Sequence, residues 1–278
     1  MMTGQIKNSF VRLKSNKLIF ALLIASLAIP VLRMLGLYTE YQYFMLQGYD
    51  TFQYASKNDP RSMYQVLTFI LAVFTYLFIS EDKFEGGFRN KITCGVRRSS
   101  IYLSELIVTA FFAELYTACF VFSWIITFKI SGKFGTRLFY SVPFKSYVIF
   151  FLWSMAFAAL FTLVNVYFSN RIFAVLLSLV MLTAFNNIGS FIEGRLNAPY
   201  KEKVVSEETG EEYWRENPHY ISGKPRQVLT RIAERTPEKG LSEKTTDHVI
   251  RTQAQATIFL FILSGSAGII SFQRKDLV

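Results

Sequence analysis

Residues 146–192 read SYVIFFLWSMAFAALFTLVNVYFSNRIFAVLLSLVMLTAFNNIGSFI, and this stretch decides the fold class. It holds two apolar runs, at about 146–168 and 172–192, separated by a few residues that include Asn170 and Arg171. A membrane-spanning helix needs about 20 mostly apolar residues, because the hydrocarbon core is about 30 Å thick. The stretch therefore predicts two antiparallel membrane helices joined by a tight polar turn.

Four more runs of this kind lie outside that stretch. They cover about residues 18–37, 63–80, 101–128 and 255–272, and Phe alone supplies 28 of the 278 residues. A soluble domain of this length would not need apolar runs that are long enough to cross a bilayer. We therefore expect an all-α integral membrane protein with six transmembrane helices.

Polar segments divide this protein into three parts. Residues 1–17 carry four cations and no acid, and predict a short amphipathic helix at the membrane interface. Residues 193–254 hold equal numbers of acidic and basic residues and predict a water-exposed insert with short helices such as RQVLTRIAER. The expected parts are a transmembrane domain with five spans and a coupling loop at 81–100 (residues 1–192), the insert (193–254), and the sixth span with its tail (255–278).

The distribution of Lys and Arg predicts the orientation. With the N-terminus inside, the short cytoplasmic segments hold twelve of these residues and the short outer loops hold six. Cytoplasmic loops carry the excess of basic residues, and long segments count little in this rule. We expect a multi-pass protein of the cytoplasmic membrane with both termini in the cytoplasm and the insert outside.

The loop after the second span reads FEGGFRNKITCGVRRSSIYLSELI at residues 84–107. Gly86 and Gly87 permit a sharp turn where the chain leaves the membrane, and Gly95 suits the left-handed end of a helix. The pattern predicts a short helix over residues 88–94. On the residues alone, an ordinary positively charged cytoplasmic loop is the simpler interpretation.

The ordered pattern in this loop resembles the coupling-helix region of type 2 ABC exporter permeases: an acid, a glycine, Arg-Asn-Lys-Ile, a second glycine, an Arg and then Ile-Tyr-Leu-Ser. Three further features agree, namely the basic amphipathic N-terminal segment, the stretch NPHYISGKPRQVL at 217–229 and the ending FQRKDLV at 272–278. The resemblance covers most of the chain in order. One departure is Glu105, where members of the family often have Lys.

The resemblance implies the permease subunit of an ATP-driven exporter of peptides, antibiotics or lipid-like molecules. A separate ABC ATPase subunit would bind the ATP, and a second permease chain, identical or a sister, would complete the transporter. By resemblance, the ATPase-coupling element maps to Glu85, Gly86, Arg89, Asn90, Lys91, Gly95 and Arg97. The rival interpretations are an ATPase-independent secondary transporter and a membrane scaffold protein.

Motifs for covalent chemistry are absent from the sequence. The pairs Gly132-Lys133 and Gly223-Lys224 lack the rest of a phosphate-binding loop, so the chain has no Walker A motif of its own. No nucleophile elbow and no His-Glu-x-x-His motif occurs. We expect a protein that is not an enzyme, with no catalytic residues, metal or cofactor. The net charge is +10, and most of the basic residues flank apolar runs. This arrangement favours contact with membrane lipids over nucleic acid.

Glu114 lies near the middle of the third span. An ionisable group at that depth costs roughly 2.5–3.5 kcal/mol, so it usually faces protein or water. Glu114 therefore either lines a translocation path, where it would suit a cationic substrate, or makes a structural hydrogen bond to Ser, Thr or Asn of a neighbouring span. The sequence leaves both interpretations open.

Overall fold

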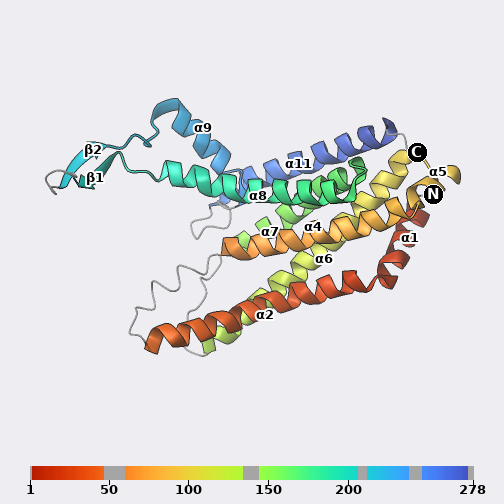
Figure 1. Cartoon of the computed structure of the whole chain (residues 1–278), viewed down its shortest axis with the longest axis horizontal. Coiled ribbons are helices and arrows are strands. Elements are labelled where there is room, and N and C mark those ends of the chain that lie inside the picture. Colours follow the sequence, from red (N-terminus) through yellow and green to blue (C-terminus); the bar gives the residue numbers. More distant parts are fainter. Residues whose placement is uncertain (1, 47–59, 134–143, 206–211, 238–245, 275–278) are drawn as a thin grey trace.

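The computed structural model describes residues 2–46, 60–133, 144–205, 212–237 and 246–274. These residues form helices, apart from one two-stranded hairpin and the connecting turns (Figure 1). The element order is α1 (Met2–Ser15), α2 (Lys17–Leu46), α4 (Pro60–Phe84), α5 (Gly87–Thr93), α6 (Arg98–Lys133), α7 (Phe144–Tyr167), α8 (Arg171–Leu196), β1 (Lys201–Val205), β2 (Glu212–Glu216), α9 (Gly223–Ala233) and α11 (Asp247–Arg274).

Six helices are long and apolar enough to cross a membrane: α2, α4, α6, α7, α8 and α11. This confirms the predicted all-α fold with six spans. Several of them continue past the apolar runs. The last span was predicted to begin at about residue 255, but α11 begins at Asp247, and α8 continues to Leu196. Hydropathy identifies only the part of a helix that suits hydrocarbon, so the polar turns at its ends escape detection.

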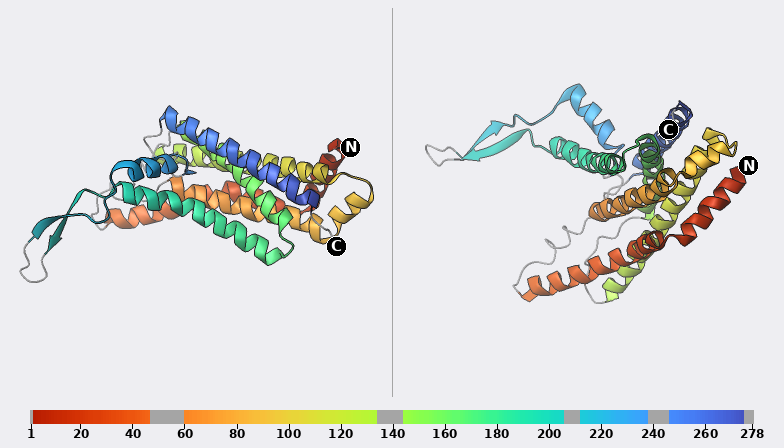
Figure 2. Two further views of the ribbon diagram at one scale, coloured as in Figure 1. Left: turned by 90° about the horizontal axis from the view of Figure 1, so that it is seen from above. Right: turned by 45° about the vertical axis from the view of Figure 1, so that its right-hand side comes forward.

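The two ends of the bundle differ in character. Helix α5 lies at the same end as both termini of the chain, whereas the hairpin and α9 lie at the opposite end (Figure 1). Figure 2 shows the same separation in two further views, with the hairpin projecting beyond the helices. The arrangement matches the predicted topology in one respect: the termini and the loop after the second span share one side, and the insert has the other.

Helices α4, α6 and α7 form the centre of the bundle. Between half and two thirds of their apolar stretches are buried, against 17% for α2 and 28% for α8 and for α11. Aromatic side chains fill the centre. The Tyr64 ring meets the Phe150 ring edge-on at 5.4 Å, and the Phe74 and Tyr116 ring centroids are 5.0 Å apart. The outer helices thus leave broad apolar faces for lipid or another chain.

Polar side chains attach the outer helices to this centre. On α6, the Tyr116 hydroxyl donates to the Ile19 carbonyl of α2 at 2.9 Å, and the Ser123 hydroxyl donates to the Leu27 carbonyl at 2.5 Å. On α7, the Trp153 indole N–H donates to Gln253 of α11 at 3.0 Å. In hydrocarbon no water competes for these groups, so such bonds fix which helix faces meet.

A small residue brings α11 close to α6. A Cβ atom on Gly268 would lie 2.0 Å from the Tyr102 hydroxyl oxygen, which leaves no room for any side chain. The Tyr102 hydroxyl donates to the Ser264 carbonyl at 3.3 Å. Close approach of this kind is a usual role of glycine between membrane helices, because no hydrophobic force draws them together within lipid.

The insert differs from its prediction, because it is not purely helical. Helix α9 confirms the expected helix around RQVLTRIAER, but strands β1 and β2 precede it as an antiparallel pair, with Lys203 opposite Trp214. The strands KEKVV and EYWRE combine β-branched and aromatic side chains, and opposite charges face each other across the pair, at Lys201–Glu216 and Glu202–Arg215, which suits a two-stranded ribbon. The many charged residues of this segment indicated only a water-exposed insert, and the two short strands were not predicted.

Candidate functional site

A sharp turn places α5 directly after the second span. The turn uses Gly86, whose φ of 79° lies in the left-handed region, and Gly95 has φ 80° just beyond the helix end. Gly87 has a different reason to be glycine. A Cβ there would lie 2.0 Å from a carboxylate oxygen of Asp82 and 2.7 Å from its carbonyl. The predicted short helix between two glycine turns is therefore present, at Gly87–Thr93.

One face of α5 is attached to the bundle. Phe88 is only 2% exposed, and its ring meets that of Phe272 edge-on at 5.4 Å, near the end of the last span. Close by, the Arg98 guanidinium donates to the Gln273 carbonyl at 3.2 Å. The base of α5 and the start of α6 thus both contact the end of α11.

The other face of α5 points away from the protein. Five of the seven residues that were predicted to couple to an ATPase are exposed, and Gly86 is half-buried. The exposed five are Glu85, Arg89, Asn90, Gly95 and Arg97. Together with exposed Thr93 and Cys94 they form a polar, positively charged surface at the tip of the bundle, which we call the α5 tip.

Lys91, which the resemblance assigns to the same coupling element, does not belong to this surface. Its side chain is 16% exposed and its ammonium group contacts two carboxylates, those of Asp82 and Glu105, the latter at 3.0 Å. The reason is electrostatic. Both carboxylates lie at the boundary of the apolar core, where an unpaired charge is costly, and Lys91 is the cation of α5 that reaches them.

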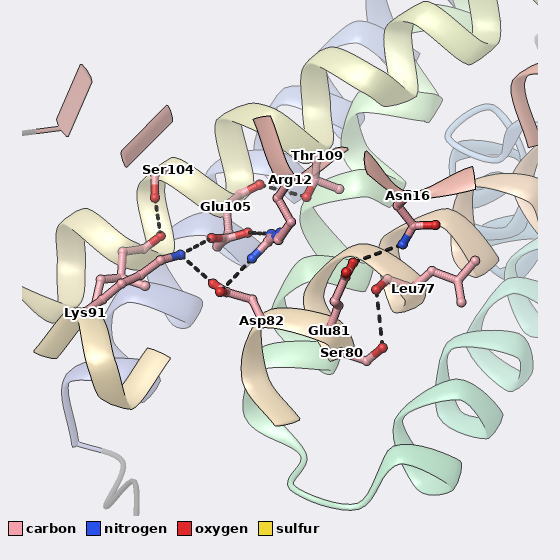
Figure 3. Close-up of polar contacts among 11 residues, drawn as sticks. Arg12, Asn16, Leu77, Ser80, Glu81, Asp82, Lys91, Ser104, Glu105 and Thr109 are labelled. Carbon is pink, nitrogen blue, oxygen red and sulfur yellow. Dashed lines mark hydrogen bonds and ion pairs between the residues drawn. The ribbon is translucent and has the colours of Figure 1, made fainter. Parts of the chain in front are cut away.

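Lys91 is one of four residues in an ion-pair cluster, which consists of Arg12, Asp82, Lys91 and Glu105 (Figure 3). The Arg12 guanidinium lies 2.7 Å from Asp82 and 3.2 Å from Glu105, so each cation contacts both acids. The four side chains come from α1, α4, α5 and α6. Arg12 also stacks over the Phe78 ring at 4.4 Å from its centroid.

The cluster is neutral and nearly dry. Glu105 is 0% exposed, Asp82 8% and Arg12 19%. Burial alone would lower the pKa of Arg12, but the nearby Glu105 and Asp82 carboxylates more than offset this and hold the pKa above its usual value. Replacing one partner of such a group leaves the others buried and uncompensated, which is more costly than losing a surface pair.

The sequence interpretation missed three of the four cluster residues. It noted Glu105 only as a departure from the family pattern and used Arg12 only in a charge count, while Asp82 was unremarked. The available signal was the position of the two acids: Asp82 and Glu105 each lie within the last or first turns of an apolar run. Acids at such positions usually need a cation from another segment.

Two further contacts join the helices at this end. The Asn16 side chain donates to Glu81 at 3.0 Å and accepts from the Leu18 N–H at 3.0 Å, so it caps α2 while binding α4. The Lys83 ammonium donates to three carbonyls at the end of α7: those of Asn165 at 3.0 Å, Val166 at 3.2 Å and Phe168. A cation suits the last carbonyls of a helix and the negative end of its dipole.

Glu114 lies apart from the cluster, farther along α6. It is half-buried and accepts a hydrogen bond from the Ser154 hydroxyl of α7 at 2.9 Å. The same hydroxyl is within 2.8 Å of the Phe151 carbonyl. This is the structural hydrogen bond that the sequence left open. Part of the Glu114 side chain also stays accessible beside this bond.

Within the described residues, no group of three or more His, Cys, Asp or Glu side chains is arranged to hold a metal ion. Cys94 and Cys119 are both free thiols; Cys94 is exposed at the α5 tip and Cys119 lies within α6. The chemistry that the site supports is therefore electrostatic contact at the α5 tip and charge pairing beneath it.

Comparison with known families identifies the kind of protein that carries this arrangement. The family model described as ABC-2 family transporter protein matches residues 5–185, well over half of the chain. The chain belongs to this family. Among curated proteins none matches the chain.

The family match extends from α1 into α8. It includes the whole ion-pair cluster and the α5 tip, while the hairpin, α9 and α11 lie outside it. The chain is thus the membrane component of an ABC-2 type transporter, a permease with six spans.

The cluster makes a first prediction about stability. Glu105→Gln removes one charge from a fully buried group and leaves two cations facing a single carboxylate. We expect it to lower the free energy of unfolding on the order of 3 kcal/mol. The measurement is an SDS or thermal unfolding titration of the purified protein. Glu85→Gln is the matched control, because Glu85 is exposed and its loss should change stability by less than about 0.5 kcal/mol. Equal effects of the two changes would contradict a stabilising cluster.

Proposed function

We propose that the chain is the permease subunit of an ATP-driven exporter, and that a separate ABC ATPase subunit docks on the α5 tip. The observation that carries this proposal is the two-sided character of α5. Its exposed face is polar and positively charged, while its buried face is fixed by Phe88 and Lys91 to three helices of the bundle. A helix of this kind can receive a partner on one side and pass its displacement on from the other.

The ion-pair cluster supplies the route for that displacement. Lys91 of α5 contacts Asp82 of α4 and Glu105 of α6, and both acids contact Arg12 of α1. ATP bound by the partner would favour one position of α5, and the cluster would shift three helices with it. Alternating access then follows as a change in the populations of two arrangements, inward-open and outward-open. The chain itself performs no covalent step.

A second permease chain completes the proposal. Helices α2, α8 and α11 are the least buried of the six spans, and each leaves large side chains exposed, such as Leu32, Phe191 and Phe259. Lipid or another copy can cover such faces. Two permeases, identical or sister chains, would enclose a path between them.

The proposed orientation places the α5 tip and both termini in the cytoplasm. It is supported by the excess of Lys and Arg in the short segments at that end. The hairpin and α9 then lie outside the cell, and substrate moves towards them. A peptide, an antibiotic or a lipid-like molecule would suit a path between apolar helices.

Neither of the two rival functions requires a helix at the position of α5. In a secondary transporter or a scaffold the loop at 81–100 would need only its positive charge. Setting the orientation of the chain in the membrane does not require a helix between two left-handed glycines, nor a buried Phe and an inward-facing Lys within it. This favours the docking role.

The docking role is tested by reversing one charge on the α5 tip. Arg89→Glu should release the ATPase subunit or abolish substrate-stimulated ATP hydrolysis, because a cation that faces the partner becomes an anion. The protein should still insert, since four of the five Lys and Arg residues of the loop remain, and these residues rather than the net charge set the orientation. The measurements are co-purification of the ATPase and hydrolysis in the reconstituted complex. Arg231→Glu on α9 makes the same charge change on an exposed surface at the opposite end, and should leave both unchanged. Wild-type behaviour of Arg89→Glu would remove the proposal's main support.

The orientation can be tested with a thiol that the chain already has. In a Cys119→Ala background, Cys94 at the α5 tip should resist a membrane-impermeant maleimide on intact cells and react in inside-out vesicles. A cysteine introduced at the exposed position Gln227 of α9 should show the opposite pattern. Labelling of Cys94 on intact cells would reverse the assignment of sides.

The role of Glu114 is tested by changing each of the two residues of its hydrogen bond with Ser154 in turn. If Glu114 faces a cationic substrate in the path, Glu114→Gln should reduce transport about ten-fold or more, as expected when a desolvated charge pair of at least 1.4 kcal/mol is lost. Ser154→Ala removes the donor but keeps the carboxylate, so transport should persist. Transport would be measured with the ligand that co-purifies with the complex. Equal losses in both variants would assign Glu114 to helix packing alone.

A further inference from the structure

A groove with a volume of about 400 Å³ lies between α1, α2 and α6. Its walls are apolar: Phe10 and Val11 come from α1, Phe20 and Leu23 from α2, and Phe112 from α6. Phe10 contacts Phe112 with ring centroids 5.6 Å apart, which closes one side. Among the residues whose side chains the structure describes, Lys7 is the one charged residue that lines it.

The groove is open along an apolar surface. Val11 is 63% exposed and Phe20 is 50% exposed, and both border it. Water is poorly stabilised in this groove, because the walls offer it almost no hydrogen-bonding group. Because α1 lies at the end of a membrane span, this opening faces the boundary between hydrocarbon and headgroups. A hydrocarbon chain is the occupant that matches such walls.

The charge at the rim selects the head of that occupant. Residues 1–17 contain four cations and no acid, so no carboxylate of this segment competes for Lys7. Arg12 is engaged in the ion-pair cluster, whereas Lys7 is exposed at the groove. A Lys beside an acyl-chain groove favours a headgroup with a net negative charge over a zwitterionic one, whose phosphate is already balanced by its own ammonium group.

We propose that this groove binds an acyl chain of an anionic phospholipid, with the lipid phosphate paired to Lys7. The site would hold α1 against α2 and α6 on the lipid side, while Arg12 holds α1 from the protein side. The proposal does not depend on the exporter function, because it concerns only the lipid that stays with this chain.

The experiment uses the full chain in nanodiscs made with equal amounts of phosphatidylglycerol and phosphatidylcholine. After extraction and mild delipidation, native mass spectrometry counts the lipids that remain. We expect one phosphatidylglycerol molecule per chain to persist and phosphatidylcholine to be lost. Equal retention of the two lipids, or loss of both, would overturn the proposal.

Two pairs of variants test whether the lipid binds in the groove. Lys7→Met should weaken retention about five-fold, the ratio expected for one Lys near an anionic headgroup. Lys17→Met removes an equal charge from an exposed position that does not line the groove, and should have no effect. Equal losses in the two variants would show only general attraction to the surface.

The second pair tests the apolar part. Leu23→Trp fills the groove and should expel the lipid, whereas Ile24→Trp places the same ring on a lipid-exposed position outside it. Circular dichroism and unfolding of all four variants show whether each remains folded. Retention of phosphatidylglycerol by folded Leu23→Trp would overturn the proposal even if Lys7→Met weakens binding.

Discussion

Two carboxylates and two cations have to neutralise one another at the edge of the apolar core, and the shape of the α5 end follows from this pairing. Arg12, Asp82, Lys91 and Glu105 each come from a different helix. None could be left alone in that position, since a buried unpaired charge is costly. A helix of seven residues such as α5 is not stable on its own. Its position therefore depends on Lys91 in the cluster and on the buried ring of Phe88.

Polar and charged contacts also join the other helices at the α5 end of the bundle. Near the cluster, Lys83 binds the last carbonyls of α7 and Asn16 links α1 and α2 to Glu81, so charged and polar bonds connect most of the bundle. At the opposite end, the Arg226 guanidinium of α9 donates to the Leu196 carbonyl at 2.8 Å, so this helix is attached to the end of α8. The groove that we assign to a lipid borders the firmly connected end, where α1 would respond to both lipid and protein.

The sequence predicted the six spans and the short helix because both depend on local patterns. Apolar length identifies a span, and paired glycines identify the sharp turns around α5. The orientation of Lys91 could not be predicted in this way, because it depends on Asp82 and on Glu105, whose own positions are set by how α4 and α6 pack. Arg12 and Glu105 are 93 positions apart, so nothing local connects them. The hairpin was missed for another reason: its strands are short and charged, and alternation over five residues is a weak signal.

The order of the four cluster residues along the chain has a consequence for biogenesis. Arg12 is synthesised first, then Asp82, Lys91 and Glu105, so the charges emerge in the order positive, negative, positive, negative. Each charge of the cluster after Arg12 finds an opposite one already made, and the sum over these four residues never exceeds a single positive charge. Glu105, which ends fully buried, emerges last, when both of its cations are already present. The nascent chain can thus enter the membrane segment by segment, and each carboxylate of the cluster has a cation available when it is buried.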